Sequence, residues 1–88
     1  MPLLVWLLPP VDRLDHPDGA LLLYEHRLSS VSVLGAAVLD RATTPVAPTD
    51  LAAPLAAEFG EPAHGSIGDA LEGVVAELVR AGVLEWLR

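Results

Sequence analysis

The chain of 88 residues carries twelve acidic side chains against five arginines and no lysine, giving a formal net charge of -7 at pH 7. Nucleic acids bind proteins largely through neutralisation of their phosphates, so this charge argues against DNA or RNA as a partner. The absence of cysteine removes disulfides, thiolate metal sites and cysteine nucleophiles, and it fits a reducing compartment. An apolar fraction of 52% in so short a chain predicts one small folded domain over residues 1–88.

The first eight residues are almost entirely apolar, as in some targeting segments. Met1–Leu8 nevertheless lacks a basic beginning, is stopped by two prolines and is far shorter than a membrane span. We therefore expect a soluble, unprocessed chain in the cytoplasm, with no membrane partner. Leu3–Leu8 is typical of a short buried strand, and the loop Pro9–Gly19 after it leaves room for another at Val11–Leu14.

A hairpin is predicted next along the chain. The apolar run Ala20–Tyr24 favours a central strand buried on both faces, and Glu25–Ser29 is a short, mostly polar connection. Ser30–Leu34 alternates small polar and apolar residues, which is the pattern of a half-buried strand. If this strand lies at the edge of the sheet, its unpaired N–H and C=O groups can accept a peptide as a further strand. The substitution Val33→Pro is then expected to weaken peptide binding.

Helices are expected after the hairpin. The apolar spacing changes from two to about 3.6 near Gly35, which is the expected N-cap of a first helix with Val38 and Leu39 facing inward. A second helix is predicted over Leu51–Phe59. Pro54 near its start is expected to cost a hydrogen bond or to shift that start.

The third helix, expected from Ile67 to Ala81, has the clearest signals. Ser66 precedes it in a variant of the capping box, and Gly82 stands where a C-cap glycine belongs. Apolar residues recur at helical spacing along one face, which places Leu71 in the core. The closing residues Val83–Leu87 form an apolar tail or a short strand. The predicted fold class is therefore α+β.

Residues that carry enzyme chemistry are not grouped in this sequence. His16, His26 and His64 lie in separate predicted loops or turns, so no pair has the spacing of metal ligands. The order of residues suggests no Ser-His-Asp constellation, and there is no glycine-rich phosphate loop. We expect no catalytic residue, no metal and no cofactor, and hence a protein that is not an enzyme.

The order of three strands and three helices, closing on Ala81-Gly82-Val83-Leu84, resembles the PqqD-like family. Members of this family are small chaperone-like domains, also called precursor-peptide recognition elements. The matching segments are the hairpin Leu22–Tyr24 and Val31–Leu34, the run Gly35–Leu39, the helix Leu51–Gly60 and the closing stretch Leu71–Leu84. The chain has Gly35 where the family often has asparagine.

The resemblance implies a small winged-helix-like domain, with a three-stranded antiparallel sheet followed by three helices. It implies that the leader segment of a ribosomally synthesised, post-translationally modified peptide precursor adds as a strand and packs against the third helix. The partner would be a maturation enzyme of the same pathway, such as a radical-SAM protein, a cyclodehydratase or a lasso-type leader peptidase. The peptide-binding residues carried over in this way are Ser30, Val31, Ser32, Val33, Leu34, Glu72, Val75, Ala76 and Val79.

Three other functions compete with peptide capture as interpretations of this sequence. A structural partner subunit of an enzyme complex is compatible with the apolar composition. A winged-helix DNA-binding domain would share the order of helices, but Asp69, Glu72 and Glu77 on the third helix oppose it. Gly65-Ser66-Ile67 resembles the modified-serine segment of acyl and peptidyl carrier proteins, but those proteins have further helices after that serine.

Overall fold

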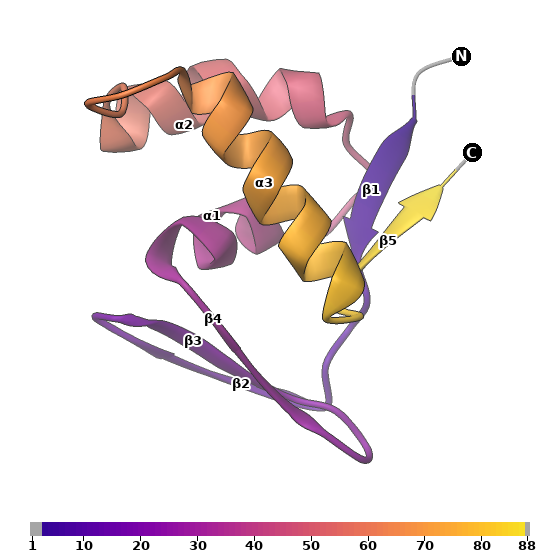
Figure 1. The fold of residues 1–88 in the computed structure, drawn as a ribbon. Coiled ribbons are helices and arrows are strands. Elements are labelled where there is room, and N and C mark those ends of the chain that lie inside the picture. Colours follow the sequence, from indigo (N-terminus) through magenta and orange to yellow (C-terminus); the bar gives the residue numbers. More distant parts are fainter. Residues whose placement is uncertain (1–2, 88) are drawn as a thin grey trace.

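The computed structural model describes residues 3–87 and shows a small α+β domain (Figure 1). Its elements combine a three-stranded antiparallel sheet, a two-stranded ribbon, three α-helices and one short 3₁₀ helix, η1. In chain order they are β1 Leu4–Leu7, β2 Asp12–His16, β3 Gly19–Leu23, β4 Leu28–Val31, α1 Val33–Arg41, η1 Pro48–Leu51, α2 Ala52–Phe59, α3 Ile67–Arg80 and β5 Leu84–Leu87. The predicted fold class, with its antiparallel sheet and three helices, is confirmed.

The three-stranded sheet is a meander in which β3 lies between β2 and β4. This confirms the prediction of a central strand at Ala20–Tyr24, but β3 is buried on one face only, because Leu23 on the outer face is exposed. β2 overlaps the optional strand Val11–Leu14. The turn between β2 and β3 needs Gly19, whose φ is +138° and where a Cβ atom would collide with the carbonyl oxygen of Val31. Only glycine therefore lets β3 begin so close to the end of β4.

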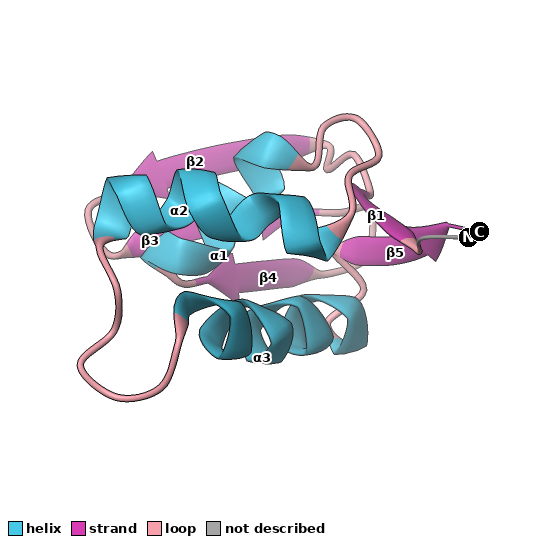
Figure 2. Cartoon of the chain, turned by 90° about the horizontal axis from the view of Figure 1, so that it is seen from above, coloured by secondary structure: helices cyan, strands magenta, loops and turns pink. Residues whose placement is uncertain are grey.

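The other two strands form a separate ribbon. The strand predicted at Leu3–Leu8 exists as β1, but it pairs with β5 and not with the hairpin. An isolated bridge from Val5 to Val46 flanks β1 on its other side. Figure 2 shows this ribbon at the end of the molecule away from the turn between β2 and β3.

The end of β4 corrects one prediction. The strand expected at Ser30–Leu34 stops at Val31, and Val33 and Leu34 already belong to α1. Ser32, rather than Gly35, is the N-cap: its Oγ accepts a hydrogen bond from the N–H of Gly35 at 3.0 Å. Alternating Ser and Val fit a strand equally well, but a serine hydroxyl that satisfies a free helix N–H favours the helix start here.

The position of Val33 also corrects the expected effect of Val33→Pro. Val33 is the first residue of α1, where the backbone N–H has no partner within the helix and proline is tolerated. Ser32 before it is extended, with φ -70° and ψ 170°, as the residue before a proline prefers to be. This substitution therefore does not test the edge of the strand.

The second and third helices begin in different ways. α2 follows directly on η1 and starts at Ala52, so that Pro54 is its third residue and its missing N–H falls among those that are free anyway. In α3 the predicted caps are confirmed: Ser66 Oγ accepts from the N–H of Asp69 at 3.1 Å. Gly82 has φ +77°, and the N–H of Val83 donates to the carbonyl of Leu78 at 3.0 Å in a Schellman pattern.

A single hydrophobic core lies between the helices and the inner faces of the strands. Val38 and Leu39 of α1 and Leu71 of α3 are buried there, as predicted, together with Leu22 of β3 and Val5 of β1. Among residues 3–87, no helix is long and apolar enough to cross a membrane. The core leaves the outer face of the three-stranded sheet and both flanks of α3 for other contacts.

Candidate functional site

The outer edge of β4 is the first part of the candidate site. Within residues 3–87, β4 pairs with β3 alone, so one side of this strand has no neighbour in the sheet. The expectation of an edge strand is therefore met by Leu28–Val31, although it is shorter than predicted.

The register shows which backbone groups point outward from this edge. Tyr24 N–H donates to the carbonyl of Arg27 at 2.8 Å, which closes the hairpin. Bonded and unbonded pairs alternate along an antiparallel ladder, so Ser29 and Val31 point their backbone groups at β3, whereas Leu28 and Ser30 point theirs outward. Leu23 lies opposite Leu28 in this ladder. Its carbonyl accepts a hydrogen bond from the N–H of Val11 on the other side of β3, as this alternation requires.

The two faces of the sheet differ strongly at this edge. Val31 lies on the inner face with Ala20, opposite it on β3, and both are buried. Leu28 lies on the outer face, where 64% of its surface is exposed. Leu14 of β2 and Leu23 of β3 are also exposed on that face, which forms a shallow apolar surface.

The tip of the hairpin is tied to the end of α3. Arg27 Nη2 donates to the carbonyl of Gly82 at 2.6 Å, and its guanidinium lies 4.5 Å from the centre of the Tyr24 ring. The Tyr24 hydroxyl in turn donates to the carbonyl of Leu8 at 2.8 Å. Burial raises the pKa of Tyr24 above its ordinary value, an effect that the nearby charge of Arg27 partly offsets. These contacts set how close β4 comes to the last turn of α3.

The flank of α3 toward β4 and the start of α1 is not the predicted one. Ala70 and Ile67 share a hollow with Val33 and Leu34 at one end of this flank. Nearer the other end of this flank, the side chains of Leu78 and Val31 both lie within 4 Å of the place that a Cβ atom on Gly35 would occupy. On a helix of 3.6 residues per turn, the neighbours of Ala70 on this flank are Val74 and Glu77.

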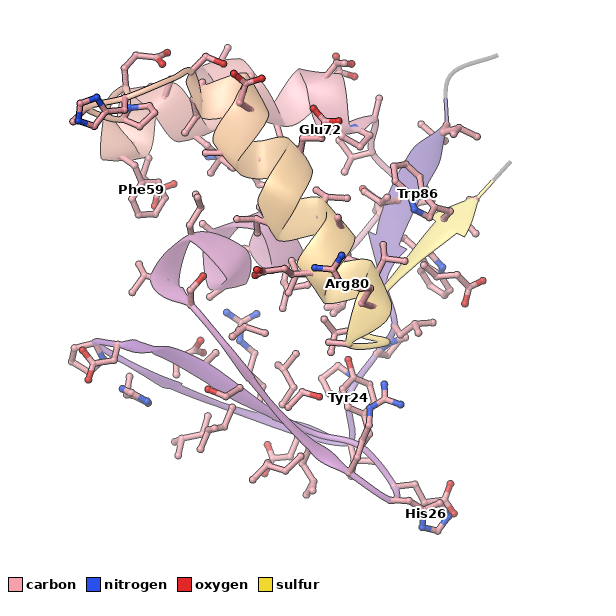
Figure 3. All side chains as sticks on the ribbon, in the orientation of Figure 1. Tyr24, His26, Phe59, Glu72, Arg80 and Trp86 are labelled. Atoms are coloured by element: carbon pink, nitrogen blue, oxygen red, sulfur yellow. The ribbon has the colours of Figure 1, made fainter. Side chains whose placement is uncertain are left out.

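The predicted residues of α3 line a groove on the opposite flank. This groove has a volume of about 700 Å³ and runs between α3, η1 and the end of β5. In Figure 3, Glu72 and Trp86 lie on the side of α3 toward η1 and β1, while Tyr24 and His26 of the hairpin lie below the last turn of α3. The groove is lined by Pro48, Thr49, Ala52, Gly68, Leu71, Glu72, Val75, Ala76, Val79, Arg80 and Trp86.

The structure thus divides the predicted site into two surfaces. Ser30 and Val31 belong to β4, Ser32 caps α1, and Val33 and Leu34 lie in the first turn of α1. The other four predicted residues, Glu72, Val75, Ala76 and Val79, lie together in the groove. A peptide paired with β4 would not lie in that groove.

Sequence reasoning missed three side chains at these surfaces. Leu28 was assigned to the turn, yet it is the first residue of β4. Arg27 was not singled out, because its partner is 55 residues away. Trp86 belongs to the apolar closing stretch Val83–Leu87, yet it is 41% exposed and lines the groove.

The chain was also compared with known proteins. No protein-family model matches it, and neither the curated proteins nor the solved structures gave a match. In the part of the chain that the structure describes, no three His, Asp or Glu side chains are grouped as a metal ion would require.

Proposed function

We propose that this protein is a non-catalytic peptide-binding domain that takes up an extended peptide as a further strand beside β4. The observation that carries the proposal is the edge of β4, where Leu28 and Ser30 direct backbone N–H and C=O groups away from the sheet. No residue of this strand is charged, so nothing on it repels an incoming strand.

Backbone pairing alone is too weak for a stable complex. Leu28 and Ser30 together offer two donors and two acceptors, and each hydrogen bond is worth about 0.5–1.5 kcal/mol net. Association costs about 4–15 kcal/mol in lost freedom, so over most of this range four such bonds offset only part of the cost. Side chains of the peptide must therefore supply much of the affinity.

The two faces of the sheet suggest which side chains these are. Alternate residues of an added strand point to opposite faces. Those on the inner face would lie toward the flank of α3 that carries Ala70 and Val74, both half-buried. Those on the outer face would extend the apolar surface of Leu28 and Leu23. The proposed peptide is therefore apolar at alternating positions.

The resemblance to the PqqD-like family suggests the source of the peptide. In this proposal it is the leader segment of a ribosomally synthesised precursor, held in the cytoplasm and presented to a maturation enzyme of the same pathway. The net charge of -7 favours a leader with lysine or arginine outside the paired stretch.

Calorimetric titration with the leader of a precursor encoded beside this protein tests the proposal. We expect saturable binding to the wild type, and at least about tenfold weaker binding to Ser30→Pro, which removes one outward N–H. Ser30→Ala is the matched control, because it changes the same side chain but keeps the outward N–H.

Two results would contradict the proposal. One is the absence of binding to the cognate leader at high micromolar concentration. The other is equal affinity of the wild type and a folded Ser30→Pro variant, which would place the peptide elsewhere. Circular dichroism of each variant shows that it has folded.

A further inference from the structure

The groove beside Trp86 is a second surface, distinct from the edge of β4. It lies on the flank of α3 that carries Gly68, Glu72 and Ala76, whereas the hairpin is tied to the end of α3 on the other side, through Arg27 and Gly82. A strand added to β4 would leave this groove empty. The two surfaces are able to hold two partners at once.

The shape of the groove favours a helix as its occupant. One wall is α3 and the other is formed by Pro48, Thr49 and Ala52, so of its lining residues only Trp86 belongs to a strand. Almost no strand edge is thus present for backbone pairing. Trp86 is the single aromatic among the lining residues, so the groove is not the aromatic-lined kind that binds polyproline segments, and a helix in the groove is the mode that fits. Gly68 and Ala76 on the α3 wall are small and exposed, which allows another helix to approach closely.

The charges at the groove give the occupant a direction. Glu72 and Arg80 are both exposed, and neither takes part in an ion pair among residues 3–87. They stand eight residues apart on α3, a rise of about 12 Å at 1.5 Å per residue. An occupant that matches them carries a base near Glu72 and an acid near Arg80.

These charges fit a helix that runs antiparallel to α3. In that direction the acid near Arg80 falls in the first half of the incoming helix and the base near Glu72 in its second half. The helix dipole favours acids near the beginning of a helix and bases near its end. A parallel helix would need the unfavourable arrangement at both places.

We propose that the groove between α3, η1 and Trp86 binds an amphipathic helix of a partner protein, antiparallel to α3. The apolar stripe of this helix packs on Ala52, Ala76 and Val79 and on the exposed side chain of Trp86. Its acidic residue meets Arg80 and its basic residue meets Glu72. This proposal goes beyond peptide capture at β4 and does not depend on it.

The test uses two designed peptides of about 15 residues, stapled to keep them helical. Each carries leucines at i, i+4 and i+7. One has glutamate before the leucines and lysine after them, and the other has these charges exchanged. Backbone amide shifts of isotopically labelled protein report where each peptide binds.

We expect the first peptide to shift the amides of Gly68 and Ala76 and the indole of Trp86, and to bind about five- to tenfold more tightly than the exchanged peptide. Ala76→Arg fills the groove and should weaken binding at least about tenfold. Gly73→Arg, on the solvent side of the same helix, is the matched control and should bind normally. The double variant Glu72→Arg with Arg80→Glu should prefer the exchanged peptide.

Other outcomes would overturn the proposal. Equal binding of both peptides, or shifts confined to β4, would show that these charges do not select the occupant. Shifts of the same groove residues that grow with the concentration of the protein alone would assign the groove to a second copy of the chain. Saturable binding of dodecyl sulfate below its micelle concentration, without binding of either peptide, would assign it to a small apolar ligand.

Discussion

The two outer strands of the three-stranded sheet, β2 and β4, present very different edges. Four of the five residues of β2 are titratable: Asp12, Arg13, Asp15 and His16. β4 has none, and reads Leu-Ser-Ser-Val. Charged side chains on an edge strand prevent another strand from pairing with it. The charged edge of β2 therefore disfavours a further strand, whereas the uncharged edge of β4 allows one. A peptide strand is expected to add beside β4 only.

The two strands are also held in the domain by different forces. The side chain of Arg13 ties β2 to α1, because its Nη1 lies 2.8 Å from Oδ1 of Asp40. Its Nη2 lies 2.8 Å from Oδ1 of Asp15 within β2. Burial alone would lower the pKa of Arg13, but its hydrogen bonds to these two carboxylates, and their charges, raise it above the ordinary value. β4 pairs with β3 through its backbone, as β2 does, but its other close contact is the backbone approach of Val31 to Gly19.

The largest effect is expected at that close approach. Gly19→Ala forces a positive φ on a residue with a side chain and sets a Cβ against the carbonyl of Val31. The free energy of unfolding should fall by about 2–4 kcal/mol. Urea unfolding followed by circular dichroism measures this change.

Gly73→Ala supplies the control for Gly19→Ala. Gly73 lies inside α3 with nothing within 4 Å of its added Cβ, so this variant should gain about 0.5–1 kcal/mol. An unchanged urea midpoint for Gly19→Ala would show that β4 does not depend on the close approach.

A smaller loss is expected from Tyr24→Phe. The change removes the hydrogen bond to the carbonyl of Leu8 and should cost about 1 kcal/mol at neutral pH. Because the pKa of Tyr24 is raised in the folded state, folding favours the neutral hydroxyl. The stability that the neutral Tyr24 hydroxyl gives the folded state is complete below the unfolded pKa of about 10. It is lost as the pH rises through the folded pKa.

Urea titrations between about pH 7 and 11 test the Tyr24 prediction. The wild type should lose stability above about pH 10 more steeply than Tyr24→Phe, because only the wild type must ionise this hydroxyl. Parallel curves for the two proteins would contradict the role given to Tyr24.

A still smaller loss of stability is expected at the charged edge strand, β2. Asp40→Ala removes one partner of Arg13, but the side chain of Asp40 is 62% exposed, so the loss should be about 0.2–1 kcal/mol and should shrink at high salt. A double-mutant cycle with Arg13→Gln isolates the pair. A coupling energy of zero at low salt would mean that the pair between Arg13 and Asp40 does not help to hold β2 against α1.

The smallest change in stability is expected where the two edges are made alike. Leu28→Lys gives β4 a charge like those of β2, and Leu28 is 64% exposed, so the free energy of unfolding should change by less than about 0.5 kcal/mol. Calorimetric titration should nevertheless show that this variant binds the peptide more weakly than the wild type. Leu14→Lys, at a similarly exposed leucine on β2, should leave binding unchanged; equal losses in both variants would disprove the open edge.

Local signals predicted much of this fold. Ser66 and Gly82 mark the ends of α3 by hydrogen bonds within a few residues, so their meaning is visible in the sequence. The apolar run of β3 likewise identified the centre of the sheet. The end of β4 was misplaced because the alternation at Ser32 and Val33 fits both a strand and a capped helix start.

The candidate site was harder to predict because it depends on contacts between distant segments. Helical periodicity gives α3 two flanks beside its apolar face, but it does not determine which of them faces β4. That choice depends on contacts between distant segments, such as the bond from Arg27 to Gly82 across 55 residues and the hollow that Ala70 shares with Val33. The groove depends on Trp86, whose strand pairs with β1 from the other end of the chain.

The β1–β5 ribbon has a consequence for how the molecule folds. The meander β2–β3–β4 joins neighbouring segments, and such hairpins form in about 1–10 μs. The ribbon joins Leu7 to Leu84 and Leu4 to Leu87, contacts of high sequence separation that slow folding. We therefore expect the meander to form first and β1 to acquire its partner late. Until β5 arrives, β1 is a transient apolar edge, and mispairing during refolding should begin there.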